Sequence, residues 1–368
     1  MVAAGGSNQT LQLSRVELRI PGRLPSGEPT SFGVLPKKVV DGVPAVTKPK
    51  VFVARRIPAI GLDRIVAECD ADVWSDPLPP PRDELLKRVA GCNGILSLLT
   101  DRIDAEVMDA AGEQLKVISN FAVGYNNIDV AEATRRGIVI GNTPGVLTEA
   151  TADLALALML AAARCLHDAR QFIDDGRWKT WDPLGHIGQD LNGKTLGVVG
   201  MGRIGMSVAR RCFGGWNMRV RYCSRTEKPQ AASAVNADRV ELDQLLRESD
   251  FVSVHTSLTD ETRHLFGADA FRQMKSTAVF VNTARGPVHD QAALYEALKS
   301  GEIFAAGIDV TDPEPMQSDD LLLTLPNCVI APHIGSGTTE SRNGMADIAA
   351  DNLLAGLAGR PLRHQVTA

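Results

Sequence analysis

Three side chains suited to acid–base chemistry and anion binding follow short apolar runs in the C-terminal half of the chain. Arg285 follows the run 278–282, Glu314 follows 305–310 and His333 follows 329–332. A guanidinium holds a carboxylate through two hydrogen bonds, and an imidazole exchanges protons near neutral pH. A carboxylate beside an imidazole favours its charged form. We therefore predict that Arg285 binds a substrate carboxylate, and that His333 is a general acid and base with Glu314 as its partner.

The apolar runs that precede these residues have the length and composition of buried parallel strands. Ligands of open parallel sheets bind beyond the carboxyl ends of the strands, so the common placement favours a shared function. Taken singly, each residue has a simpler explanation. Arg285 could bind backbone carbonyls, Glu314 could be a solvated loop residue and His333 a core histidine.

Residues 196–205 have the pattern of a strand, a glycine-rich turn and the start of a helix. Gly200 permits the tight turn, Gly202 lets the backbone approach a pyrophosphate, and Gly205 lets the helix pack closely on the strand. The unpaired N–H groups at the start of the helix attract phosphate. The pattern predicts a dinucleotide site formed by Gly200, Gly202, Arg203, Ile204 and Gly205.

The turn after the second predicted strand, 218–223, bears on the choice of dinucleotide. An NAD site usually has a carboxylate there to bind the ribose 2′-hydroxyl. This chain has Ser224, Arg225 and Thr226 instead. Arg225 is suited to a 2′-phosphate, with hydroxyl donors on either side, which predicts NADPH rather than NADH. The alternative is that Arg225 is solvated and Glu227 reaches the ribose.

The composition is that of an ordinary globular protein with two domains. The chain has 368 residues, of which 44% are hydrophobic and 23% charged, and its net charge is −5. That charge gives no reason to expect binding to nucleic acid or to an anionic membrane. Six cysteines without C-x-x-C pairs favour a reducing cytoplasm over a disulfide framework or a zinc site, and we predict no metal.

Strands and helices alternate from residue 50 onwards, which predicts α/β architecture with parallel sheets and right-handed crossovers. We predict a substrate domain formed by 49–147 together with 336–368, and a dinucleotide domain formed by 148–335. One long apolar helix, from 148 to about 174, is expected to connect the two. Residues 1–48 are rich in Gly, Pro and Ser and are interpreted as an extension, with a transit peptide as the alternative.

Four segments together resemble the D-isomer-specific 2-hydroxyacid dehydrogenase family, and the resemblance covers about residues 50–365. They are 198–205, 281–286, 306–315 and 332–336. Within the family the chain is most similar to the glyoxylate/hydroxypyruvate reductases, on the segments 51–58, 143–148 and 352–357.

The resemblance implies a flavodoxin-like substrate domain beside a Rossmann domain, and hydride transfer between NADPH and a small 2-keto acid. It implies the roles given above for Arg285, Glu314 and His333. It also implies that the N–H groups of Val123 and Gly124 bind the substrate and that Asp309 contacts the nicotinamide amide. A homodimer is expected, with Trp181 reaching the partner's substrate cleft or, alternatively, packing within its own subunit.

Other functions on the same scaffold stay open at this point. D-lactate, phosphoglycerate or formate are alternative substrates, although formate dehydrogenases of the family lack an acidic residue where this chain has Glu314. A dinucleotide-sensing corepressor is a non-enzymatic alternative, with residues 1–48 as its recruiting extension.

Overall fold

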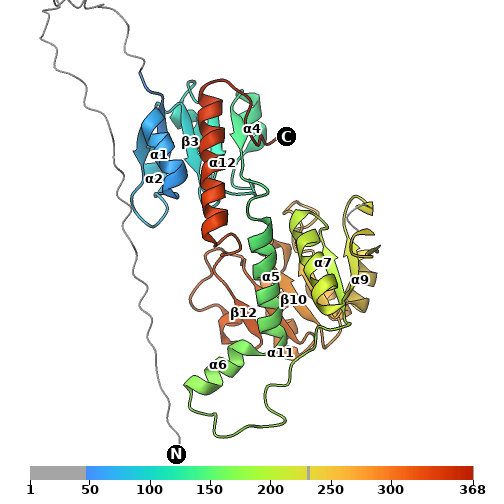
Figure 1. Ribbon diagram of the computed structural model, residues 1–368. Coiled ribbons are helices and arrows are strands. Elements are labelled where there is room, and N and C mark those ends of the chain that lie inside the picture. Colours follow the sequence, from blue (N-terminus) through green and yellow to red (C-terminus); the bar gives the residue numbers. More distant parts are fainter. Residues whose placement is uncertain (1–46, 230–232, 368) are drawn as a thin grey trace, which may run out of the picture. The chain divides into compact units, whose positions relative to one another are not determined.

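The computed structural model describes residues 47–229 and 233–367, which form two parallel-sheet α/β domains (Figure 1). The predicted fold class is confirmed. The predicted extension, 1–48, lies outside the described residues except for Thr47 and Lys48. The predicted domain boundaries near residues 148 and 336 stay a prediction.

The first sheet has five strands, and every neighbouring pair is parallel. In spatial order they are β2 Asp70–Val73, β1 Lys50–Val53, β3 Gly94–Ser97, β4 Val117–Asn120 and β5 Val139–Gly141. The order 2-1-3-4-5 is that of flavodoxin-like folds. One face of the sheet is covered by α1, Ala59–Glu68, and by the C-terminal helix α12, Thr339–Leu357 (Figure 1). The other face is covered by α2 Arg82–Val89, α3 Ala105–Ala111 and α4 Val130–Arg135.

The second sheet has seven parallel strands and is also enclosed by helices on both faces. In spatial order they are β12 Cys328–Ile330, β11 Ala305–Ile308, β10 Val279–Asn282, β9 Phe251–Val254, β6 Thr195–Val199, β7 Arg219–Cys223 and β8 Asp238–Arg239. The order reverses direction at β6, between β9 and β7, and ligands of doubly wound sheets bind beside such a reversal. One face carries α5 Thr148–Ala163 and α7 Arg203–Trp216, and the other carries α9 Leu242–Glu248, α10 Ala268–Gln273 and α11 Gln291–Ser300.

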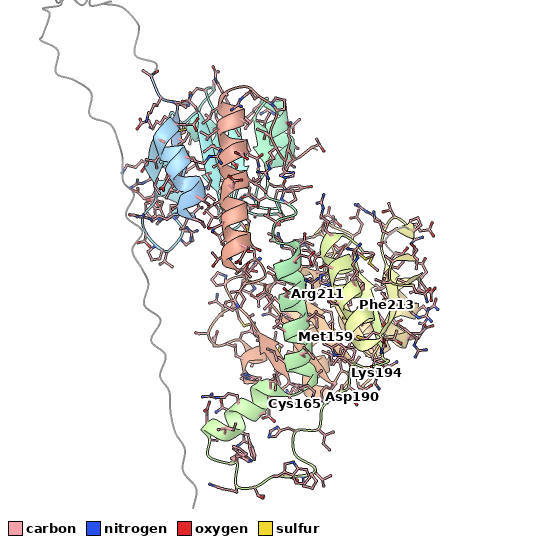
Figure 2. The ribbon with its side chains drawn as sticks, viewed as in Figure 1. Met159, Cys165, Asp190, Lys194, Arg211 and Phe213 are labelled. Atoms are coloured by element: carbon pink, nitrogen blue, oxygen red, sulfur yellow. The ribbon has the colours of Figure 1, made fainter. Side chains whose placement is uncertain are left out.

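Ion pairs join the start of α5 to α7. Arg211 on α7 contacts Glu149 at 2.8 Å and Asp153 at 2.9 Å, and the Ser207 hydroxyl donates to Glu149 at 2.7 Å. Figure 2 labels Arg211 on α7 and Met159 on the neighbouring helix α5. These contacts fix the beginning of α5 against the helix that follows the glycine-rich turn.

The predicted single helix from 148 to about 174 is wrong, because the structure has two helices there. Helix α5 ends at Ala163, α6 spans Leu166–Asp174, and the two are bent by 61°. Cys165, labelled in Figure 2, adopts a left-handed backbone conformation (φ 54°) at the break. No side chain of α6 is buried, whereas half of α5 is. No single described helix is long and apolar enough to cross a membrane; the bent pair α5–α6 reaches the length and composition only together.

Candidate active site

His333 and Glu314 form a close pair beyond the carboxyl ends of β12 and β11. The His333 Nδ1 lies 2.5 Å from Glu314 Oε1, and the two side chains are 23% and 29% exposed. The backbone of His333 is left-handed (φ 54°), and its N–H donates to the carbonyl of Asp309 at 2.9 Å. The predicted pairing of these residues is therefore present, with the imidazole held at one nitrogen and partly exposed to solvent.

Asp309, at the end of β11, holds the backbone that follows His333. Its two carboxylate oxygens accept hydrogen bonds from the N–H groups of Ile334 at 2.7 Å and Gly335 at 2.8 Å. Burial raises the pKa of the Asp309 carboxyl, and the two N–H groups oppose that shift. These contacts position the turn that carries His333. The contact of Asp309 with the nicotinamide amide stays a prediction.

Arg285 follows β10, and neighbouring residues fix both its backbone and its side chain. Its guanidinium donates to the carbonyl of Ala284 at 2.6 Å and to Asn126 Oδ1 at 3.2 Å. Its own carbonyl accepts from the Asn282 side chain at 3.0 Å, and the same amide nitrogen lies 3.0 Å from Nδ1 of the buried His289. Burial lowers the pKa of the Arg285 guanidinium, and the negative charge of Glu314 opposes that shift.

Gly124, which follows Val123 in the loop after β4, lies against Arg285. A Cβ atom added to Gly124 would stand 1.7 Å from Arg285 Nη2. The N–H groups of both residues donate no hydrogen bond to any other described residue. The structure thus brings together a guanidinium and two backbone donors, a combination suited to a carboxylate.

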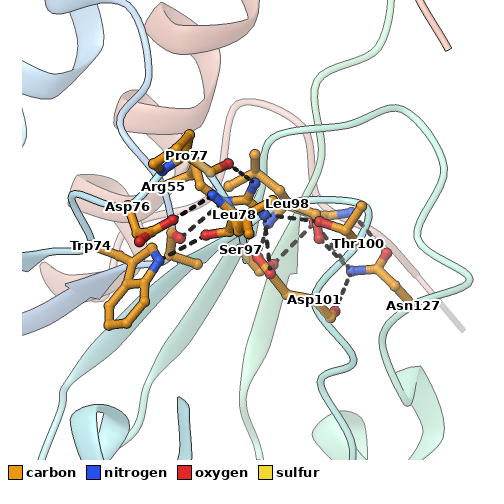
Figure 3. Close-up of polar contacts among 12 residues, drawn as sticks. Arg55, Trp74, Asp76, Pro77, Leu78, Ser97, Leu98, Thr100, Asp101 and Asn127 are labelled. Atoms are coloured by element: carbon orange, nitrogen blue, oxygen red, sulfur yellow. Dashed lines mark hydrogen bonds and ion pairs between the residues drawn. The ribbon is translucent and has the colours of Figure 1, made fainter. Parts of the chain in front are cut away.

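A partly buried polar network includes Asn127, at the end of this loop (Figure 3). The Asn127 side chain donates to the carbonyls of Leu98 and Asp101, both at 2.9 Å, and lies 3.2 Å from the amide of Asn120. The Asp101 carboxylate accepts from the Leu98 N–H at 2.7 Å and lies 3.7 Å from Arg55. Burial raises the pKa of Asp101, while that N–H and Arg55 lower it. The network connects the ends of β1, β3 and β4.

The glycine-rich turn has the geometry that a pyrophosphate requires. Gly200 has a left-handed backbone (φ 97°), and a Cβ there would lie 2.7 Å from the backbone of His255 and Thr256. A Cβ on Gly202, the N-cap of α7, would meet nothing within 4 Å, whereas one on Gly205 would lie 2.3 Å from the Gly200 carbonyl. Of these three glycines, only Gly202 has open space beside it, in front of the first N–H groups of α7. The glycine-rich turn and the start of α7 therefore fit a dinucleotide phosphate.

The turn after β7 is partly exposed; it contains Arg225 and is contacted by Arg239 of β8. The Ser224 hydroxyl donates to the carbonyl of Thr226 at 2.7 Å, so its hydrogen is used within the turn. Arg239 donates to the carbonyl of Ser224 at 3.1 Å, and Arg225 and Thr226 are exposed. The pKa of Glu261 is lowered by a hydrogen bond with Thr259 and, to a smaller degree, by the charge of Arg225.

Trp181 is not brought to this site within the chain. Its side chain is 81% exposed and lies in the loop after α6, which also carries the exposed side chains of Trp178, Leu184 and Ile187. Sequence reasoning missed Asn126, Asn282 and Asn127, whose side chains bind backbone or Arg285. Within the described residues, no cluster of three or more His, Cys, Asp or Glu side chains could hold a metal ion.

Comparisons with known proteins find similar sequences over most of the chain. The NAD-binding domain of the D-isomer specific 2-hydroxyacid dehydrogenases matches residues 156–335. The glyoxylate reductase of Korarchaeum cryptofilum is 50% identical over 309 residues, which cover 84% of this chain and 92% of that protein. The human glyoxylate reductase/hydroxypyruvate reductase is 46% identical over 319 residues, covering 86% and 97%.

A solved structure resembles the fold as a whole. The NADPH-dependent glyoxylate/hydroxypyruvate reductase of Sinorhizobium meliloti, in complex with NADP and malonate, superposes with a TM-score of 0.74 at 31% identity. The match covers 87% of this chain and 97% of that one.

Proposed function

The chain belongs to the D-isomer-specific 2-hydroxyacid dehydrogenase family, and we propose that it reduces glyoxylate to glycolate and hydroxypyruvate to D-glycerate with NADPH. The observation that carries the proposal is the contact of Gly124 with Arg285, next to two backbone N–H groups that donate to no other described residue. This arrangement suits the carboxylate of a small 2-keto acid. The names of the similar proteins support the same two substrates.

In this mechanism, Arg285 and the N–H groups of Val123 and Gly124 bind the carboxylate and orient the keto group. His333 uses its Nδ1 to contact Glu314, which leaves Nε2 to deliver a proton to the keto oxygen. Glu314 keeps the imidazole oriented and favours its protonated form. The nicotinamide cofactor, when bound, supplies the hydride for the keto carbon. Positioning and electrostatic stabilisation then lower the barrier.

We propose that Gly200, Gly202, Arg203, Ile204 and Gly205 bind the pyrophosphate and that the turn Ser224–Thr226 binds the 2′-phosphate of NADPH. The Arg225 side chain is exposed and can turn towards that phosphate. It would then give up its electrostatic interaction with Glu261. Its replacement in Arg225→Asp should raise the KM for NADPH about 10- to 100-fold, because one charge-assisted hydrogen bond is lost. The kcat should change little. A wild type that uses NADH better than NADPH would contradict this assignment and favour Glu227 as the ribose partner.

We further propose a homodimer built on the exposed apolar side chains of α6 and the following loop. Leu166, Ile173, Trp178, Trp181, Leu184 and Ile187 are all more than half exposed. Such a surface on one element is typical of an interface with a second copy. We also propose that the domain boundaries lie at residues 148 and 336 and that the protein is located in the cytoplasm.

Steady-state kinetics with a panel of 2-keto acids and both cofactors test the proposed function. We expect glyoxylate and hydroxypyruvate to give the highest kcat/KM, with NADPH preferred. Turnover of pyruvate or of a phosphorylated hydroxy acid in their place would favour the D-lactate or phosphoglycerate alternatives. Cofactor binding without any turnover would favour a sensing protein.

A further inference from the structure

Two of the segments that distinguish the chain within its family, 143–148 and 352–357, have no part in the proposed chemistry. Asn142 follows β5 and directly precedes the first segment, and Asn352 of the second segment donates a hydrogen bond to its carbonyl. The Asn142 side chain donates a hydrogen bond from Nδ2 to the carbonyl of Val123 at 2.8 Å. Asn142 therefore touches the loop that presents the two backbone donors to the substrate.

The planarity of the peptide bond turns this contact into a directional constraint. In a trans peptide the carbonyl of one residue and the N–H of the next point in opposite directions. The bond from Asn142 to the Val123 carbonyl thus makes the Gly124 N–H point away from β5. In the preceding peptide, the Thr143 N–H donates to the Ala122 carbonyl at 2.9 Å, so the Val123 N–H points away as well.

The consequence is that both N–H groups face away from the segment that fixes them. Arg285 contacts Gly124, and neither N–H donates to another described residue. A carboxylate held by Arg285 can accept both. Without the hydrogen bonds from Thr143 and Asn142, the Ala122–Val123 and Val123–Gly124 peptide planes would be less restrained, and their N–H groups would no longer be fixed towards the carboxylate.

Asn142 is itself held in place by the C-terminal helix and the segment after it. The side chain of Asn352, fully buried on α12, donates to the Asn142 carbonyl at 2.9 Å and accepts from the His364 N–H at 3.0 Å. The Asn142 N–H in turn donates to the His364 carbonyl at 3.2 Å. The backbone N–H and carbonyl of Asn142 therefore both form hydrogen bonds, which hold in place the backbone that carries its side-chain amide.

We propose that Asn142 is a positioning residue that aims the Gly124 N–H at the substrate carboxylate, with Asn352 as its support. The proposal rests on the proposed reduction of a 2-keto acid. It names a determinant of substrate binding that acts through the backbone and that touches neither the substrate nor the cofactor.

The variant Asn142→Asp tests it, because the side chain keeps its size but an ionised carboxylate cannot donate to the Val123 carbonyl. We expect the KM for glyoxylate to rise about tenfold or more, as for the loss of one hydrogen bond to a charged group. The KM for NADPH should stay within about twofold of the wild type, since the side chain lies in the other domain. A protonated aspartic acid can donate, so the ratio of the variant's KM to that of the wild type should fall as the pH is lowered.

Asn327→Asp is the matched control. The Asn327 side chain also donates to backbone carbonyls, those of Leu298 and Phe304, but at the end of the second sheet away from the site. Its KM for glyoxylate should not change. Asn352→Ala, which leaves the Asn142 side chain intact, should give a smaller rise than Asn142→Asp, and NADPH fluorescence reports that each variant is folded.

An unchanged KM for glyoxylate in Asn142→Asp, with normal NADPH binding, would overturn the positioning role while leaving the proposed function intact. An equal and pH-independent rise in Asn142→Asp and Asn327→Asp would assign the effect to general destabilisation and overturn it too. A wild type that reduces no 2-keto acid would overturn the proposed function and this inference together.

Discussion

The contact between Gly124 and Arg285 makes Gly124→Ala a direct probe of carboxylate binding. The new methyl group would stand 1.7 Å from Nη2 and 2.8 Å from Cζ of Arg285. Ordinary contact distances then require the guanidinium to move by about 2 Å. The arginine side chain is flexible at that end, so the fold should tolerate the change while the guanidinium leaves its position.

The size of the effect follows from the bonds that the movement breaks. A displacement of about 2 Å removes at least one charge-assisted hydrogen bond to the carboxylate, worth about 1.5–3 kcal/mol. We therefore expect kcat/KM for glyoxylate to fall about 10- to 150-fold, mostly through KM. The dissociation constant for NADPH should be unchanged, and the midpoint of thermal unfolding should move by no more than a few degrees.

Gly214→Ala is the control for the loss of a glycine. Gly214 lies in α7, and a Cβ there would meet nothing within 4 Å. Activity should be unchanged, and alanine should stabilise the helix by about 0.5–1 kcal/mol. If Gly124→Ala kept a normal kcat/KM for glyoxylate, Arg285 would not be the carboxylate clamp in the position described, and the reasoning would be refuted.

His333→Gln should cut kcat by orders of magnitude because the proton donor is lost, while NADPH binding stays nearly intact. Pre-steady-state kinetics report the loss of turnover, and equilibrium binding measurements report the affinity for NADPH. A near-normal kcat would exclude the acid–base role of His333. Burial lowers the pKa of His289 to about 4, below the value of about 6.5 in an unfolded chain. The stability that the neutral His289 contributes is therefore present above about pH 6.5 and is lost as the pH falls towards 4. In urea titrations, the unfolding free energy of the wild type should fall by roughly 2–3 kcal/mol more than that of His289→Val between about pH 7 and pH 4.5. Equal losses in the two proteins would contradict the burial argument. Trp181→Ala together with Trp178→Ala should shift sedimentation at micromolar concentration from dimer to monomer, and a wild type that already sediments as a monomer would exclude the proposed interface.

Much of the fold was predictable because its signals are local. The strands that form the centre of each sheet are continuous apolar runs, and the spacing of Gly200, Gly202 and Gly205 predicted the turn before α7. Strand β2 was missed because its alternating Asp, Ala, Asp and Val are only half-buried or exposed at an edge of the sheet. The break at Cys165 was missed because neither glycine nor proline marks it.

The site was predictable only in part. Arg285, Glu314 and His333 could be proposed because charged residues directly after buried strands are unusual. Asn142, Asn126 and Asn282 could not, because asparagine is common in turns and its partner is set by tertiary structure. Asp309 shows a further limit: its position was singled out through the resemblance, but its contacts to Ile334 and Gly335 appear only when the chain is folded.

The most direct test of the central claim is the product formed from hydroxypyruvate. Purified full-length protein should be incubated with hydroxypyruvate and NADPH, and the glycerate formed should be resolved by chiral chromatography. We expect D-glycerate, formed in proportion to the NADPH consumed and absent with His333→Gln. Formation of L-glycerate, or the absence of glycerate when NADPH binds normally, would contradict it.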